Sequence, residues 1–109
     1  MKSLLLDNLK ESRQRLTDHY LAKGSFSTWE GEGDNCEPVA YCLVGALGVT
    51  DTYIPALDLL ANVAQVLFPQ RCKTSGAPLL YRFNDNELTT KDDVLSVYDR
   101  AIKFLEEGK

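Results

Sequence analysis

The sequence predicts an all-α fold: a small orthogonal bundle of four main helices, in a single domain over residues 1–109. Three observations predict it. Apolar residues recur at helical spacing near both ends of the chain. Pro38 and Pro55 stand where two central helices would begin. One Gly-rich loop follows the first helix. A chain of this length can also bury its own hydrophobic core.

The first helix is predicted over residues 3–23. Ser3 suits its N-cap, and the pair Lys23 and Gly24 suits its end, because a cation and a left-handed glycine both complement a helix C-terminus. The apolar stripe has helical spacing, with a solvated face between its members, which are Leu5, Leu9, Leu16 and Tyr20.

Residues 24–37 are predicted to form a Gly-rich loop. We expect Trp29 to plug the core from this loop rather than anchor a partner, because Trp is highly buried on average. The loop is locally acidic. Its carboxylates are interpreted first as a solvated surface, and otherwise as a surface for a basic partner or a cation; they are Glu30, Glu32, Asp34 and Glu37.

A second helix is predicted over residues 39–47, directly after Pro38. It is apolar almost all round, so it should be the central buried element. A third helix should begin at Asp51 or Thr52 and end near Phe68, because Pro69 does not permit easy continuation.

The last helix is predicted between an N-cap at Thr90 and a stop at Gly108. Asp93 stands three residues after Thr90, which is a variant of the capping box. Before it, residues 79–83 are predicted to form a short helix or an extended link, because a lone strand would have no partner. The segment Arg82–Asp85 would then be the joint that aims the last helix at the core.

Composition excludes several functions. The net charge of −4 argues against a general binder of phosphate backbones. No apolar run approaches the ~20 residues of a membrane span. The three cysteines, Cys36, Cys42 and Cys72, are an odd number and indicate reduced thiols rather than a secreted disulfide framework. We therefore expect a cytoplasmic protein with no direct nucleic-acid partner and no membrane association.

No pattern in the chain dictates a catalytic chemistry. Cys42 lies inside an apolar run, where a thiol is inert, and His19 is the sole histidine that could serve it as a base. Cys36, Cys42, Cys72 and His19 lack the paired spacing of zinc ligands. Acidic residues near the last helix are explained by turn and helix-start chemistry. We expect no catalytic residue, no metal and no cofactor.

Four segments occur in a recognisable order: Trp29 in the Gly-rich part, residues 42–47, Arg82-Phe83-Asn84-Asp85, and a last helix containing Asp-Arg-Ala-Ile. In this order the chain resembles a family of small uncharacterised phage and actinobacterial proteins, which have a Cys-Ala-x-Gly-Ala run and a Trp-Asn-Asp motif. It differs by Leu43 in place of Ala and Phe83 in place of Trp. The resemblance implies an all-helical fold and a phage or mobile-element setting, and supplies no catalytic residues.

That setting favours a small acidic non-enzymatic protein that binds another protein in the host cytoplasm. Its partner would be a basic host protein, and it would inhibit a host defence factor such as a CRISPR–Cas nuclease. The expected partner-binding residues are Trp29, Glu30, Glu32, Asp34 and Glu37. The sequence leaves two alternatives open. One is a ligand-binding protein or enzyme with a pocket near Trp29, Cys42, Asn84 and Asp85; the other is a protein that self-associates through an apolar stripe.

Overall fold

Four helices and one small mixed sheet make up the part of the chain that the computed structural model describes, which is residues 2–25, 27–73 and 76–108. In chain order the elements are α1 (Lys2–Asp18), β1 (Tyr20–Leu21), β2 (Ser27–Glu30), β3 (Glu37–Tyr41), α2 (Tyr53–Leu67), α3 (Gly76–Asp85) and α4 (Lys91–Glu107). Two short 3₁₀ turns lie at Gly33–Asn35 and Pro69–Arg71.

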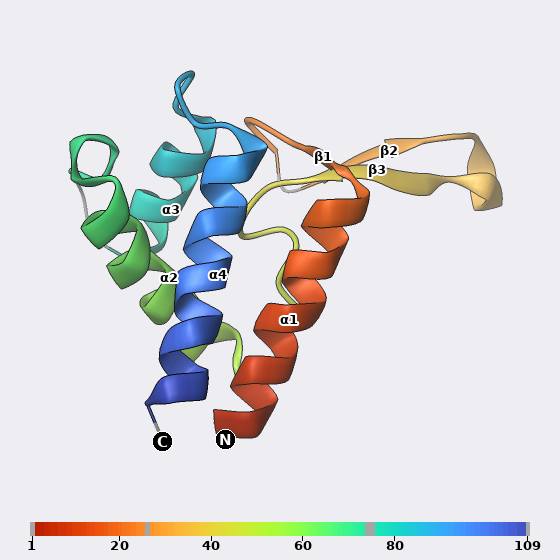
Figure 1. Ribbon diagram of the computed structural model, residues 1–109. Helices are drawn as coiled ribbons and strands as arrows, with labels where there is room; N and C mark the ends of the chain where they lie inside the picture. The colour runs from red at the N-terminus through yellow and green to blue at the C-terminus, as the bar shows by residue number, and fades with distance from the viewer. Residues whose placement is uncertain (1, 26, 74–75, 109) are drawn as a thin grey trace.

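The helices form one layered body, and part of the sheet leaves it. α4 packs against α1 on one side and α2 on the other, and α3 packs against α2. Both termini lie at the same end of the body, whereas β2 and β3 run away from the helices as an arm (Figure 1). The core is filled by large side chains from every helix, among them Leu9, Leu60, Phe83 and Tyr98.

The all-α prediction is wrong, because the sheet makes the fold α+β. β3 is its central strand, antiparallel to β2 and parallel to β1. The predicted Gly-rich loop is therefore largely a β-hairpin, whose turn uses glycines with positive φ at Gly31 and Gly33. β1 pairs with β3 across the whole of β2, and β2 has too few apolar residues to show the alternating pattern of a strand, so local patterns signal this sheet weakly.

The predicted helix over residues 39–47 is also wrong. Its first part, to Tyr41, belongs to β3, and residues 43–46 form a turn. The prediction that this segment is buried is confirmed, since Leu43, Val44 and Ala46 are almost completely shielded from solvent. The first helix is shorter than predicted: it ends at Asp18, and the chain then enters β1.

The other helices follow the sequence closely. α2 lies within the predicted bounds, and α3 confirms the short-helix alternative for residues 79–83. α4 begins with the predicted capping box, in which the Thr90 side chain accepts a bond from the Asp93 amide and the Asp93 carboxylate accepts one from the Thr90 amide. The bounds of these helices were predictable because capping and helix-terminating residues mark them in the sequence.

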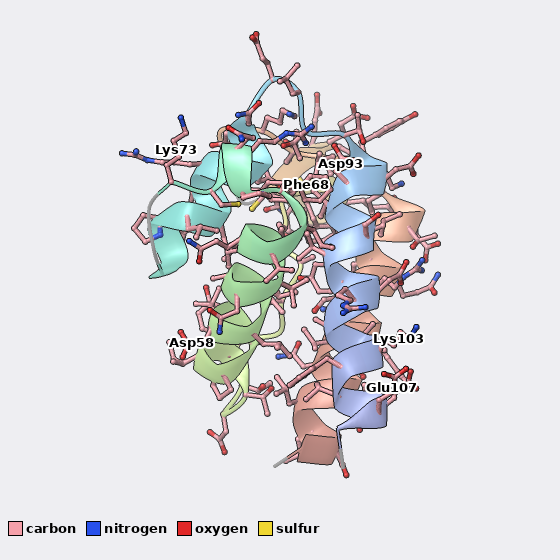
Figure 2. The ribbon with its side chains drawn as sticks, turned by 60° about the vertical axis from the view of Figure 1, so that its left-hand side comes forward. Asp58, Phe68, Lys73, Asp93, Lys103 and Glu107 are labelled. Atoms are coloured by element: carbon pink, nitrogen blue, oxygen red, sulfur yellow. The ribbon has the colours of Figure 1, made fainter. Side chains whose placement is uncertain are left out.

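A cluster at the end of α2 joins three helices. Phe68 stacks on Phe83 of α3, with 5.1 Å between ring centroids, and the Arg71 guanidinium lies 5.0 Å from the Phe68 centroid. Arg71 also donates to the Asp93 carboxylate at 2.8 Å, so the cluster reaches the start of α4 (Figure 2). Partial burial pushes the pKa of Asp93 upward, but the bonds from Arg71 and Thr90 outweigh it and hold this pKa below its ordinary value.

Candidate functional site

The arm carries an exposed tryptophan. Trp29 lies on β2 directly opposite Pro38 of β3, and 56% of its surface is exposed. Its indole Nε1 donates to the Ser27 hydroxyl at 3.0 Å. The expectation that Trp29 plugs the core is therefore wrong. The residue sits on an edge strand that has left the helical body, where no core is available to receive it.

The arm that carries Trp29 also carries carboxylates. All four predicted acidic residues are exposed, and Glu30 lies directly opposite Glu37 in the strand register. In the described part of the chain neither of these two forms an ion pair with a lysine or arginine. The arm therefore combines a large aromatic side chain with uncompensated negative charge, which comes from Glu30, Glu32, Asp34 and Glu37.

The root of the arm is held by the predicted Asn-Asp pair. Asn84 is 1% exposed, and its amide donates to the Ala22 carbonyl at 2.8 Å and to the Asp85 carboxylate at 3.0 Å. The same oxygen of Asp85 accepts from the Gly24 amide at 2.9 Å. Ala22 and Gly24 lie between β1 and β2, so the end of α3 fixes the point at which the chain enters the arm.

Asn84 also holds the buried turn after β3. Its side-chain oxygen accepts from the Leu43 amide at 2.9 Å. The Leu43 carbonyl accepts from the Tyr98 hydroxyl of α4 at 2.7 Å. Complete burial raises the pKa of Tyr98 far above its ordinary value, so this hydroxyl stays protonated as a donor. Both backbone polar groups of Leu43 are thus paired inside the core with side chains from α3 and α4.

A pocket of about 250 Å³ adjoins this network. It brings together Cys42, Asn84 and Asp85, three residues that the sequence assigned to one pocket, whereas Trp29 is absent from its described lining. The other described lining residues are Gly24, Ser25 and Tyr81. Because both amide hydrogens of Asn84 are already used by the protein, the pocket offers a ligand little polar recognition from that side chain.

Cys42 is buried, and its thiol has low reactivity. Burial raises the pKa of its thiol, and the amide bonds it receives from Gly45 and Val44 reduce that rise without cancelling it. His19, the one histidine, places its Nδ1 2.6 Å from the Arg15 carbonyl and packs edge-on against Tyr41. Neither interaction pairs it with the thiol. Among the described residues no group of three His, Cys, Asp or Glu side chains could hold a metal ion.

We expect iodoacetamide to label Cys36 in the native protein, and Cys42 only after denaturation. Cys36 is exposed on the arm, whereas Cys42 is buried with a raised pKa. Peptide mass spectrometry after brief labelling at pH 8, with and without urea, measures both sites. Native labelling of Cys42 at the rate of Cys36 would contradict this description and revive a thiol nucleophile.

The structure contains a second buried asparagine that was not among the residues predicted from the sequence. Asn8 of α1 is 6% exposed, and its side chain bonds both the amide and the carbonyl of Gly48. Its position held a signal, because Asn8 falls beside Leu5 and Leu9 on the apolar stripe of its helix. A polar residue on such a stripe needs a buried partner, but the sequence does not show which one.

Residues 2–104, almost the whole chain, match the model of a family described as a family of unknown function (DUF6197). No curated protein and no solved structure gives a significant match to the chain. None of the described helices is long and apolar enough to cross a membrane.

Proposed function

This chain belongs to the family of unknown function DUF6197, and since that family carries no assigned activity, we propose a function from the structure. The protein is a small, acidic, non-enzymatic binding module whose β2–β3 arm docks on a basic surface of another protein. One observation carries this proposal: the arm leaves the helical body and exposes both Trp29 and carboxylates that have no cationic partner among the described residues.

Exposed tryptophan and unpaired charge have complementary uses at an interface. Trp is among the residues that most often dominate binding energy, because it buries a large area with few rotatable bonds. The acidic residues would steer a basic partner toward the arm and reject acidic ones. The fold does not need Trp29 for its core, so recognition is the role that its exposure supports best.

The base of the arm is fixed to the helical body by hydrogen bonds. Asn84 and Asp85 fasten its entry through Ala22 and Gly24, and β1 pairs with its return strand. A recognition element that is ordered before binding loses less conformational entropy when the complex forms. This arrangement supports a dedicated binding element rather than a tolerated surface loop.

The partner we propose is a basic host protein, with the protein acting in the host cytoplasm as a phage or mobile-element product. The resemblance in sequence order to phage proteins supports this setting. A defence nuclease, such as a CRISPR–Cas nuclease, binds nucleic acid through a positively charged surface. An acidic arm would complement that surface and compete with the nucleic acid for it.

Reversing the charge of the arm should abolish capture of such a partner. The test variant is Glu30→Lys, Glu32→Lys and Asp34→Lys. The control reverses three other exposed carboxylates that lie outside the arm, Asp7→Lys, Asp58→Lys and Glu87→Lys, of which Asp58 points away from α2 (Figure 2). Both change the net charge equally. Affinity purification from a lysate of the source bacterium or phage host, with mass spectrometry, then identifies what each retains.

We expect the native protein and the control to retain the same basic partner, and the arm variant to lose it. Trp29→Ala should weaken the isolated complex by about 30-fold, as hot-spot residues do, without changing the melting temperature. Retention of the partner by the arm variant, or recovery of no basic partner, would contradict the proposal. A large drop in melting temperature for Trp29→Ala would show that the residue is structural instead.

A second candidate function is the binding of a small ligand in the pocket formed by Cys42, Asn84 and Asp85. The observation in its favour is that the structure brings these three side chains together beside a space of about 250 Å³. A ligand held there would stabilise the fold by mass action. A thermal-shift screen of small molecules, repeated on Asp85→Ala, tests this candidate independently of the arm.

A further inference from the structure

β2 is an outer strand of the sheet. The strand order is β1–β3–β2, and among the described residues nothing pairs with the far side of β2 (Figure 1). A strand in this position presents a row of backbone N–H and C=O groups that have no partner in the sheet. Such an edge is where another chain can add a strand.

The sheet shows which groups of β2 face outward. The Tyr41 carbonyl accepts from the Ala22 amide at 2.9 Å on the β1 side of β3. Because successive residues of a strand direct their backbone polar groups to opposite sides, those of Ala40 face β2. Thr28 is the register partner of Ala40 and faces back toward β3. The register shifts between Thr28 and Trp29, but the extra residue, Val39, is on β3, so β2 keeps its alternation. The backbone groups of Ser27 and Trp29 therefore point to the open edge.

Two like charges face each other across β2 and β3. Glu30 and Glu37 lie directly opposite one another, and like charges in that relation destabilise a sheet. In the described structure neither carboxylate is paired with a cation. A lysine or arginine placed beside them would relieve the repulsion. The opposite face of the strand presents Trp29 against Pro38, which suits an apolar side chain.

A second copy of this chain is a poor occupant of the edge. Pairing two β2 strands would join two acidic arms, each of which already carries four exposed carboxylates, and so add like charge to like charge. Charge complementarity instead favours a segment that carries cations.

We propose that β2 recruits an extended, Lys- or Arg-bearing segment of a partner protein as a fourth strand of the sheet. A cationic side chain of that segment lies beside Glu30, on the sheet face that also carries Glu37, and its backbone bonds the open edge at Ser27 and Trp29. This inference rests on the proposed function and specifies how the arm recognises its partner.

Two eight-residue peptides of alternating Lys and Thr provide the test. One has an ordinary backbone, and the other is fully N-methylated, so it keeps every charge and loses every backbone donor. Binding is measured by NMR titration of the Trp29 indole and the β2 amides. On the protein side, Ser27→Pro removes an outward N–H where edge strands tolerate proline, and Ser27→Ala is the matched control that keeps it.

We expect the ordinary peptide to bind at least tenfold more tightly than its methylated twin, and Ser27→Pro to bind it at least tenfold more weakly than Ser27→Ala. Equal affinity for both peptides that disappears in the charge-reversed arm would overturn strand addition and leave the proposed function standing. Equal affinity that survives charge reversal, or no binding of either peptide, would overturn both. Unfolding curves of both Ser27 variants confirm that the comparison is made between folded proteins.

Discussion

Replacing Asn84 with alanine should lower the free energy of unfolding by about 3–5 kcal/mol. The substitution removes the partners of two buried backbone groups, the Leu43 amide and the Ala22 carbonyl. Each such group costs about 1–3 kcal/mol when it stays buried without a hydrogen bond. The space left by the side chain adds a cavity cost.

Urea denaturation measures this loss, with Asn86→Ala as the matched control. Asn86 lies two residues further on and makes an exposed bond to the Leu88 amide, so its removal should cost less than about 1 kcal/mol. Equal losses for the two variants would show that the Asn84 bonds contribute nothing beyond an ordinary turn. The Asn84 variant should also bind its partner more weakly, because the arm loses its fixed entry point.

The joint predicted at Arg82–Asp85 thus has a more specific role than the sequence indicated. Phe83 stacks on Phe68 at the end of α2, Asn84 bonds the turn after β3, and Asp85 bonds the start of the arm. Three successive side chains connect the core to the recognition element. The local sequence does not show which distant residues these side chains bond. The sequence therefore predicted that the segment stabilises the fold, but not its partners.

The helices that were predicted well have strong local signals. α4 combines a capping box with a regular apolar face, and α2 ends at Leu67, two residues before Pro69. β3 has no comparable signal, because a short apolar run fits a buried strand and a buried helix equally well. Its two partners are a four-residue strand and a two-residue strand. Pairing with these two strands, rather than local sequence preference, makes residues 37–41 a strand.

The residues of the candidate site were predictable from the sequence, but their arrangement and exposure were not. The acidic residues and Trp29 were identified as one partner-binding group, and they do lie on one arm. Their exposure could not be read from composition, because average Trp burial favours the core. Trp29 is exposed because the hairpin extends away from the helices that form the core.

Asn8→Ala is expected to cost about 2–4 kcal/mol of unfolding free energy. The Asn8 amide donates to the Gly48 carbonyl at 3.1 Å and to the Thr52 hydroxyl at 3.0 Å, and its oxygen accepts from the Gly48 amide at 2.9 Å. Asn8 therefore fixes the buried segment 43–48 at Gly48, as Asn84 fixes it at Leu43. Gln14→Ala is the control, since Gln14 bonds Asp18 on the exposed face of the same helix and its loss should stay within about 0.5 kcal/mol.

Gly48→Ala then shows whether the bonds of Asn8 are the cause. A Cβ at position 48 would lie 3.1 Å from the Asn8 side-chain oxygen, tighter than ordinary contact. If the Asn8 side chain withdrew, it would lose its bonds to Gly48 and Thr52, so Gly48→Ala should destabilise the native protein. In the Asn8→Ala background the opposing oxygen is gone, and the same substitution should cost much less. A double-mutant cycle by urea denaturation measures this coupling; strictly additive losses would mean that Asn8 and Gly48 do not hold the segment together.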